Sequence, residues 1–87
     1  MTFELFDTVR VTRLLVPDRE VDGSSATPPQ PRVGEEGAVV EVLGDDVYLV
    51  ERVTDDGHTV WLAEFSAQEL TLSRRADAAG TDREDSA

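Results

Sequence analysis

The sequence predicts a small, mainly β domain, a strongly bent antiparallel barrel of four or five strands with one helical turn. Short runs of β-branched and aromatic residues recur along the chain, and turn-forming residues separate them. The chain has 87 residues, which is room for one domain and too few for two. No internal repeat is visible.

The strand signals fall in four segments. In residues 7–13, polar and apolar residues alternate, so that Val9 and Val11 share one face. The other three segments are short apolar runs rich in β-branched residues, at 37–43, 47–53 and 59–65.

Turn and cap signals join these runs. Gly44-Asp45-Asp46 and Asp56-Gly57 are both typical of hairpin turns. Ser66-Ala-Gln-Glu69 has the form of a capping box, which predicts one helical turn before Leu70 and Leu72 return to extended chain.

Two segments read as irregular. Residues 17–33 contain all four prolines and a Gly-Ser-Ser, so we expect a long loop after the first strand, mobile unless a contact orders it. Limited proteolysis is expected near Arg19 or Arg32. Residues 73–87 form an acidic tail that we expect to be disordered. The barrel is therefore expected to span residues 1–72.

The composition excludes several chemistries. The chain has no cysteine and no lysine, which removes thiolate catalysis, cysteine metal sites, Schiff-base chemistry and a phosphate-binding P-loop lysine. It carries 19 acidic residues against 8 arginines, a net charge of -11. That charge disfavours duplex DNA and anionic lipid. The negative charge is explained either by solubility alone or by a surface that binds a basic partner.

No apolar run is long enough to span a membrane and no signal peptide is apparent, so we expect a cytoplasmic protein.

Parts of the chain resemble a known family. Phe3-Glu-Leu-Phe-Asp-Thr-Val9, Gly34-Glu-Glu-Gly37-Ala-Val-Val-Glu-Val42, Tyr48-Leu-Val50 and Asp56-Gly-His-Thr-Val60 are similar to small bacterial proteins of the domain-of-unknown-function family 4926. More distantly, the first two stretches resemble the SH3-like domain of the nitrile hydratase β-subunit and KOW-type barrels. The resemblance covers residues 4–14 and 34–70.

The resemblance implies an SH3-like barrel and says little about function. Some members of that family occur beside toxin-like proteins, which implies a partner-neutralising role. The chain departs from the family pattern in its longer loop before Gly34 and in Arg52, where an apolar or aromatic residue is expected.

Several residues are of types found in functional sites, but their sequence context favours a structural role. Gly34 and Gly37 are expected to serve the backbone of a coiled barrel rather than a phosphate. His58 stands beside Asp55 and Asp56 in a turn, but neighbouring aspartates at a hairpin tip diverge, and no metal site or cofactor is expected. The Asp45-Asp46 turn is interpreted in the same way. No catalytic motif appears, and we expect no enzyme activity.

Trp61 is the most informative candidate. If Val60 and Leu62 face the core, alternation sends Trp61 outward beside Ala63, as a partner-binding anchor. In the reversed register, Trp61 fills the barrel. Arg52 is expected to lie over the barrel mouth and to pair with an acid such as Glu41 or Glu64. The candidate partner-binding residues are Trp61, Ala63, Phe65 and Arg52.

The leading hypothesis is a non-catalytic protein-binding module, an accessory or immunity-like or antitoxin-like subunit that contacts a protein partner or a second copy. The alternatives are a KOW-like nucleic-acid module or an acidic nucleic-acid mimic and, third, a small enzyme or metal protein. The scarcity of basic residues speaks against direct nucleic-acid binding.

Overall fold

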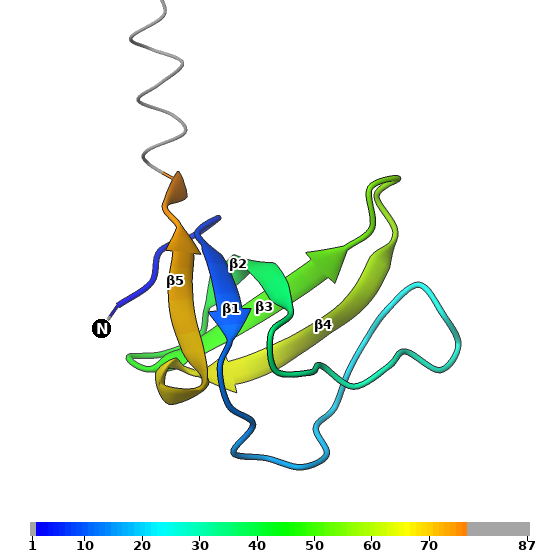
Figure 1. The fold of residues 1–87 in the computed structure, drawn as a ribbon, viewed down its shortest axis with the longest axis horizontal. Helices are drawn as coiled ribbons and strands as arrows, with labels where there is room; N and C mark the ends of the chain where they lie inside the picture. The colour runs from blue at the N-terminus through cyan, green and yellow to red at the C-terminus, as the bar shows by residue number, and fades with distance from the viewer. Residues whose placement is uncertain (1, 77–87) are drawn as a thin grey trace, which may run out of the picture.

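The structure, a computed structural model, describes residues 2–76. It contains one five-stranded antiparallel sheet in the order β4-β3-β2-β1-β5. Figure 1 shows the sheet bent so strongly that β1 and β5 cross in front of β3 and β4. The predicted all-β class and SH3-like barrel architecture are confirmed. The elements are β1 (Thr8–Val11), β2 (Glu36–Val42), β3 (Val47–Val53), β4 (Thr59–Ser66), the 3-10 turn η1 (Ala67–Glu69) and β5 (Leu70–Arg74).

The predicted turns and the predicted helix cap form at the positions that the sequence indicates. The capping box is present, with the Ser66 backbone N–H donating to the Glu69 carboxylate at 3.0 Å. Gly34 and Gly57 adopt positive φ angles of 97° and 91°, a conformation that favours glycine. Gly37 instead serves a close approach, because a Cβ there would lie 2.7 Å from the Glu51 carbonyl oxygen. Gly34 therefore has the expected positive φ angle, whereas Gly37 serves the backbone through close packing rather than through a positive φ angle.

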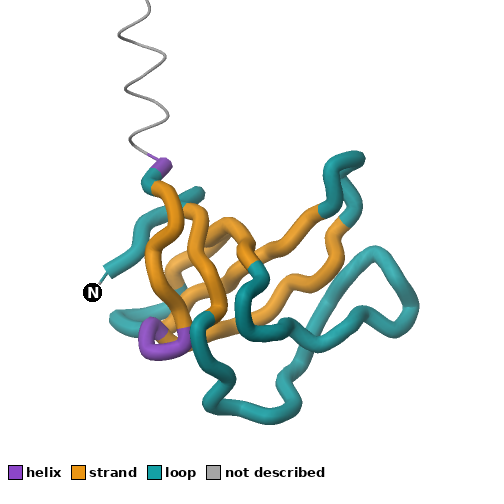
Figure 2. Tube along the Cα trace, viewed as in Figure 1, coloured by secondary structure: helices purple, strands orange, loops and turns teal. Residues whose placement is uncertain are grey.

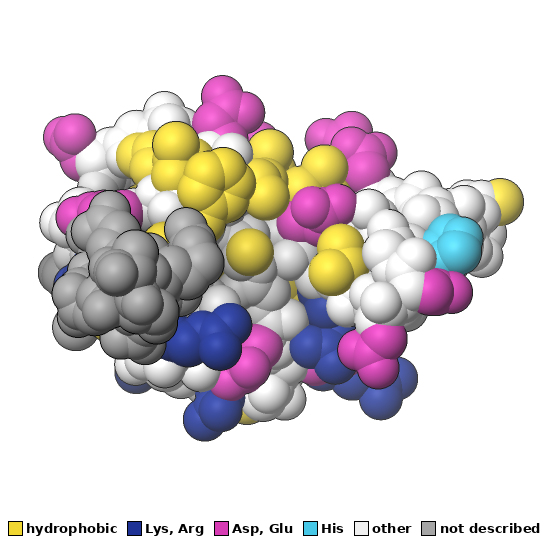
Figure 3. All heavy atoms as spheres, turned by 90° about the horizontal axis from the view of Figure 1, so that it is seen from above, with side chains coloured by type: hydrophobic (Ala, Val, Ile, Leu, Met, Phe, Trp, Pro, Cys, Tyr) yellow, Lys and Arg dark blue, Asp and Glu magenta, His cyan; other side chains and the backbone are white. Residues whose placement is uncertain are grey.

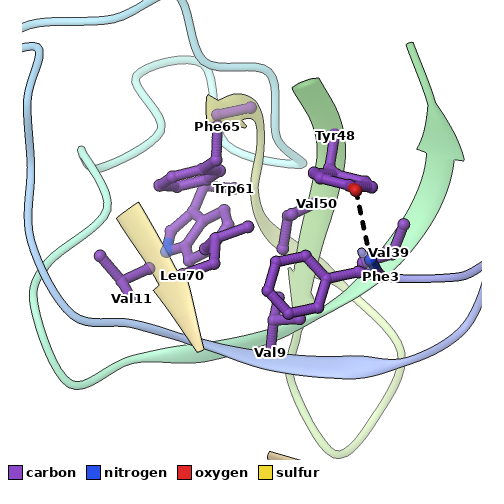
Figure 4. Close-up of a cluster of buried hydrophobic side chains, with 10 residues drawn as sticks. Phe3, Val9, Val11, Val39, Tyr48, Val50, Trp61, Phe65 and Leu70 are labelled. Atoms are coloured by element: carbon purple, nitrogen blue, oxygen red, sulfur yellow. Dashed lines mark hydrogen bonds between the residues drawn. The ribbon is translucent and has the colours of Figure 1, made fainter. Parts of the chain in front are cut away.

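The core lies inside the bend of the sheet. The buried hydrophobic residues are Phe3, Val9, Val11, Val39, Tyr48, Val50, Trp61, Ala63, Phe65 and Leu70. Figure 4 shows the aromatic rings of this core gathered between the strands, with the Phe3 N–H donating to the Tyr48 hydroxyl at 3.2 Å. Val9 and Val11 both point inward, as the alternation predicts.

Of the two orientations that the sequence leaves open for β4, the one that makes Trp61 a partner-binding anchor is wrong. Trp61, Ala63 and Phe65 are buried, Leu62 is half-buried on the outer face, and Val60 is half-buried against the edge of the core. Sequence alternation could not choose between the faces, because both faces of this strand carry apolar residues. The outer face is apolar because the chain between β1 and β2 folds against it. The reversed register, in which Trp61 fills the barrel, is the correct one.

The long segment from 17 to 33 is irregular, as predicted, but its middle is fastened to the free edge of β4. Asp22 and Leu62 exchange two backbone hydrogen bonds, of 3.0 and 2.8 Å, and the Ser24 N–H donates to the Thr59 carbonyl at 2.9 Å. Figure 2 shows this loop running alongside β4. The loop is thus ordered by contacts within its own chain, and it covers an edge that would otherwise be open to pairing.

Both ends of the described chain meet at one carboxylate. Asp7 is buried, and it accepts hydrogen bonds from the Glu4 N–H at 2.8 Å and the Ala76 N–H at 3.0 Å. Because β5 continues to Arg74 and Ala76 is still held, the predicted end of the barrel at residue 72 is too early. Most of the predicted tail, residues 77–87, lies outside the described residues.

Candidate functional site: a groove under the long loop

A groove of about 700 Å³ lies between the start of the long loop and the outer face of β3 and β4. Its position follows from the strand alternation. Tyr48 and Val50 point into the core, so Val47 and Leu49 point out, and Leu62 does the same on β4. The loop contributes the opposite wall. The lining residues are Leu15, Val16, Arg19, Glu20, Asp22, Val47, Leu49, Leu62, Ala63, Glu64, Phe65, Ser66, Gln68 and Glu69.

The groove keeps aliphatic surface open to solvent. Leu15 is 52% exposed and Val16 is 46% exposed on the loop side. Val47 is also exposed, and Leu49 and Leu62 are half-buried on the strand side. Single exposed aliphatic residues are normal in proteins, whereas a concave group of them is a candidate contact surface.

Glu69 holds the loop wall in place. Its carboxylate accepts hydrogen bonds from the Leu15 N–H at 2.9 Å and from two nitrogens of the Arg19 guanidinium at 2.5 and 3.2 Å. The Arg19 and Glu69 side chains are only 8% and 3% exposed. We call this buried pair the Glu69 latch. It joins the loop to the η1 turn and thereby positions Leu15 over the sheet.

The environment of Glu69 favours its ionised form. Burial acts to raise the pKa of this carboxyl, but hydrogen bonds from Arg19 and from the Ser66 and Leu15 backbones together hold the pKa below its usual value. The latch is also packed against the core, because the Arg19 guanidinium lies 4.4 Å from the centre of the Phe65 ring. At neutral pH the latch is therefore an ion pair with aromatic support.

The rim of the groove is negatively charged. Among its lining residues are four carboxylates, from Glu20, Asp22, Glu64 and Glu69, against the one guanidinium of Arg19. Arg19 is committed to Glu69 and to the Glu64 and Val16 carbonyl oxygens. The exposed side chains of Glu20, Asp22 and Glu64 thus set the charge that an occupant would meet.

The predicted partner-binding residues are not brought together at the surface. Ala63 and Phe65 border the groove floor but are buried, and Trp61 lies in the core, where its indole N–H donates to the Glu35 carboxylate at 2.9 Å. Arg52 lies outside the groove. Its guanidinium donates to the Glu36 carbonyl oxygen at 2.9 Å and lies 3.8 Å from the Glu35 carboxylate. Arg52 therefore pairs with an acid, as expected, but the acid is Glu35 rather than Glu41 or Glu64.

Sequence reasoning missed the residues that build the groove. Leu15 and Val16 belong to an apolar run just before Pro17, which could have been noticed as a separate signal. Arg19 lies in a segment whose proline and serine content predicts an exposed loop, so its buried pairing with Glu69 was not expected. Because its side chain is buried in the latch, Arg19 is not the exposed protease site that we expected.

A second exposed apolar feature lies at the N-terminal turn. Phe6 has a φ angle of 70°, which is uncommon for a bulky residue, and its side chain is 66% exposed. Leu5 beside it is also exposed. Figure 3 shows exposed hydrophobic side chains gathered on one part of the face seen from above, with arginines along the other side. This turn is separate from the groove lining.

The acidic clusters elsewhere are surface networks. Hydrogen bonds from the Ser73 hydroxyl and from Arg10 lower the pKa of Glu36. At the β3–β4 turn, a hydrogen bond from Thr54 and then one from His58 lower the pKa of Asp56, and the exposed His58 is visible in Figure 3 (cyan). Within residues 2–76, no three histidine or acidic side chains converge on a metal position.

No family model, no curated protein and no solved structure matches the chain. In the part of the chain that the structure describes, no helix is both long and apolar enough to cross a membrane.

Proposed function

We propose that this chain is a non-catalytic protein-binding module, which docks part of a protein partner in the groove under the long loop. The observation that carries the proposal is the convergence of aliphatic residues from distant parts of the chain on one concave surface. Leu15 and Val16 come from the start of the long loop, and Val47, Leu49 and Leu62 come from β3 and β4. The volume of about 700 Å³ is within the range of functional binding pockets.

The charge of the groove favours a protein over a nucleic acid. Nucleic-acid affinity comes mainly from cations placed on phosphates, and the groove rim places carboxylates there instead. A KOW-like nucleic-acid role is therefore the weaker alternative. An accessory or immunity-like cytoplasmic subunit that blocks its partner would need only this shape and charge.

Selection of random peptides displayed on phage, with the full chain immobilised, tests the proposal. We expect enriched peptides whose binding is lost in the Leu15→Asn variant. The matched control is Val33→Asn, because Val33 is 58% exposed against 52% for Leu15 and lies outside the groove. Both positions are already solvated, so neither substitution should change stability by more than about 0.5 kcal/mol.

Enriched peptides that bind the two variants equally well would contradict the proposal, and so would a selection that enriches none. Loss of binding in Leu15→Asn counts in favour only if circular dichroism shows that both variants remain folded.

A further inference from the structure

We infer that the occupant of the groove is an amphipathic helix of a partner protein, with an apolar stripe flanked by lysine or arginine. This inference rests on the proposed function and specifies its ligand. Three features of the groove lead to it: its unneutralised carboxylates, its closed strand edge and its two aliphatic walls.

The first feature is charge. Glu69 and Arg19 neutralise each other inside the latch, which leaves the exposed carboxylates of Glu20, Asp22 and Glu64 around the opening. An acidic or neutral ligand would leave these groups uncompensated. A ligand with cations beside its apolar contacts would complement them and associate faster.

The second feature is the state of the β4 edge. An extended peptide binds a sheet through unpaired backbone groups, yet Leu62 is paired with Asp22, and the Thr59 and Glu64 carbonyl oxygens are bonded to Ser24 and Arg19. Strand addition is therefore blocked along this part of β4. A ligand that satisfies its own backbone hydrogen bonds, as a helix does, avoids the difficulty.

The third feature is the pair of facing aliphatic walls. Leu15 and Val16 stand on the loop side, and Val47, Leu49 and Leu62 on the strand side. A helix presents a narrow apolar stripe from residues three and four apart, with charged residues on either side of it. That arrangement puts apolar side chains between the walls and cations next to the rim.

Three synthetic helical peptides with one identical leucine stripe test the inference. Their flanking positions are all lysine, all glutamine or all glutamate, and binding is measured by fluorescence anisotropy at low and high salt. We expect the lysine peptide to bind tightest and the glutamate peptide weakest, with the difference shrinking as salt rises. A lysine peptide with two interior prolines should bind at least about tenfold more weakly, because proline disrupts the helix.

Charge variants locate the effect. The double variant Glu20→Gln with Glu64→Gln should weaken the lysine peptide about three- to tenfold, as expected for exposed ion pairs. The matched control, Glu41→Gln with Asp55→Asn, removes the same charge from exposed positions outside the groove and should have less effect.

The outcomes separate the two proposals. If the lysine and glutamine peptides bind equally well and both depend on Leu15, the basic ligand is wrong and the groove function stands. If the proline peptide binds as well as its parent, the helix is wrong. If the lysine peptide binds Leu15→Asn as tightly as the wild type, its binding is general attraction to an acidic protein, and the groove proposal fails with it.

Discussion

Replacing Trp61 with alanine should lower the free energy of unfolding by about 3–5 kcal/mol. The side chain has no exposed surface, and its ring packs 5.5 Å from that of Phe65. Removing it would leave a large cavity and would take away the indole N–H that donates to the Glu35 carboxylate. Small domains are stable by only about 5–15 kcal/mol, so the variant would be close to unfolding at room temperature.

Urea unfolding followed by far-ultraviolet circular dichroism measures this effect, since the variant lacks its tryptophan fluorophore. Val33→Ala is the control, because Val33 is mostly exposed and its truncation should change stability by about 0.5 kcal/mol or less. A loss below about 1 kcal/mol for Trp61→Ala would mean that Trp61 faces solvent, with the whole of β4 shifted by one residue.

Replacing Glu69 with glutamine should cost about 3 kcal/mol or more, because it leaves the buried Arg19 guanidinium without its counter-charge. It should also free the loop wall, because the same carboxylate holds the Leu15 N–H. Trypsin should then cut after Arg19 much faster than in the wild type. Glu36→Gln is the control: Glu36 also pairs with an arginine, Arg10, but that pair is exposed and screened by solvent, so its loss should change stability far less.

The latch also predicts a dependence on pH. The folded-state pKa of Glu69 lies below its usual value, so its stabilisation is present above the unfolded-state pKa of about 4.3 and is lost as pH falls through the folded-state pKa. Wild-type stability should therefore fall more steeply below about pH 4 than that of Glu69→Gln. Parallel acid profiles for the two proteins, or unchanged cleavage at Arg19, would show that the pair does not hold the loop.

The strands and turns were predictable because their signals are local. The run 47–53 matches β3 at both ends, and the Ser66–Glu69 capping box appears as the η1 turn. Gly57 adopts the left-handed conformation that an Asp-Gly turn requires. In each case the local structure is determined by residues that are neighbours in the sequence.

The groove was not predictable because it depends on contacts between distant residues. Arg19 and Glu69 are 50 positions apart, and nothing near Arg19 indicates that it is buried. Asp22 pairs with Leu62 at the edge of β4, 40 positions further along the chain. Both faces of β4 carry apolar residues, so alternation alone could not place Trp61. Sequence reasoning therefore sought an interface on the wrong face of the correct strand.

The measurement that tests the central claim most directly is a methyl NMR titration of the full chain with the lysine-flanked helical peptide. The account predicts saturating shifts confined to the groove methyls, those of Leu15, Val16, Val47, Leu49 and Leu62. The methyls of Val33 and Val53, which are exposed but lie outside the groove, should stay unchanged. Shifts centred instead on Leu5 and the N-terminal turn, or spread evenly over the exposed aliphatic residues, would contradict it.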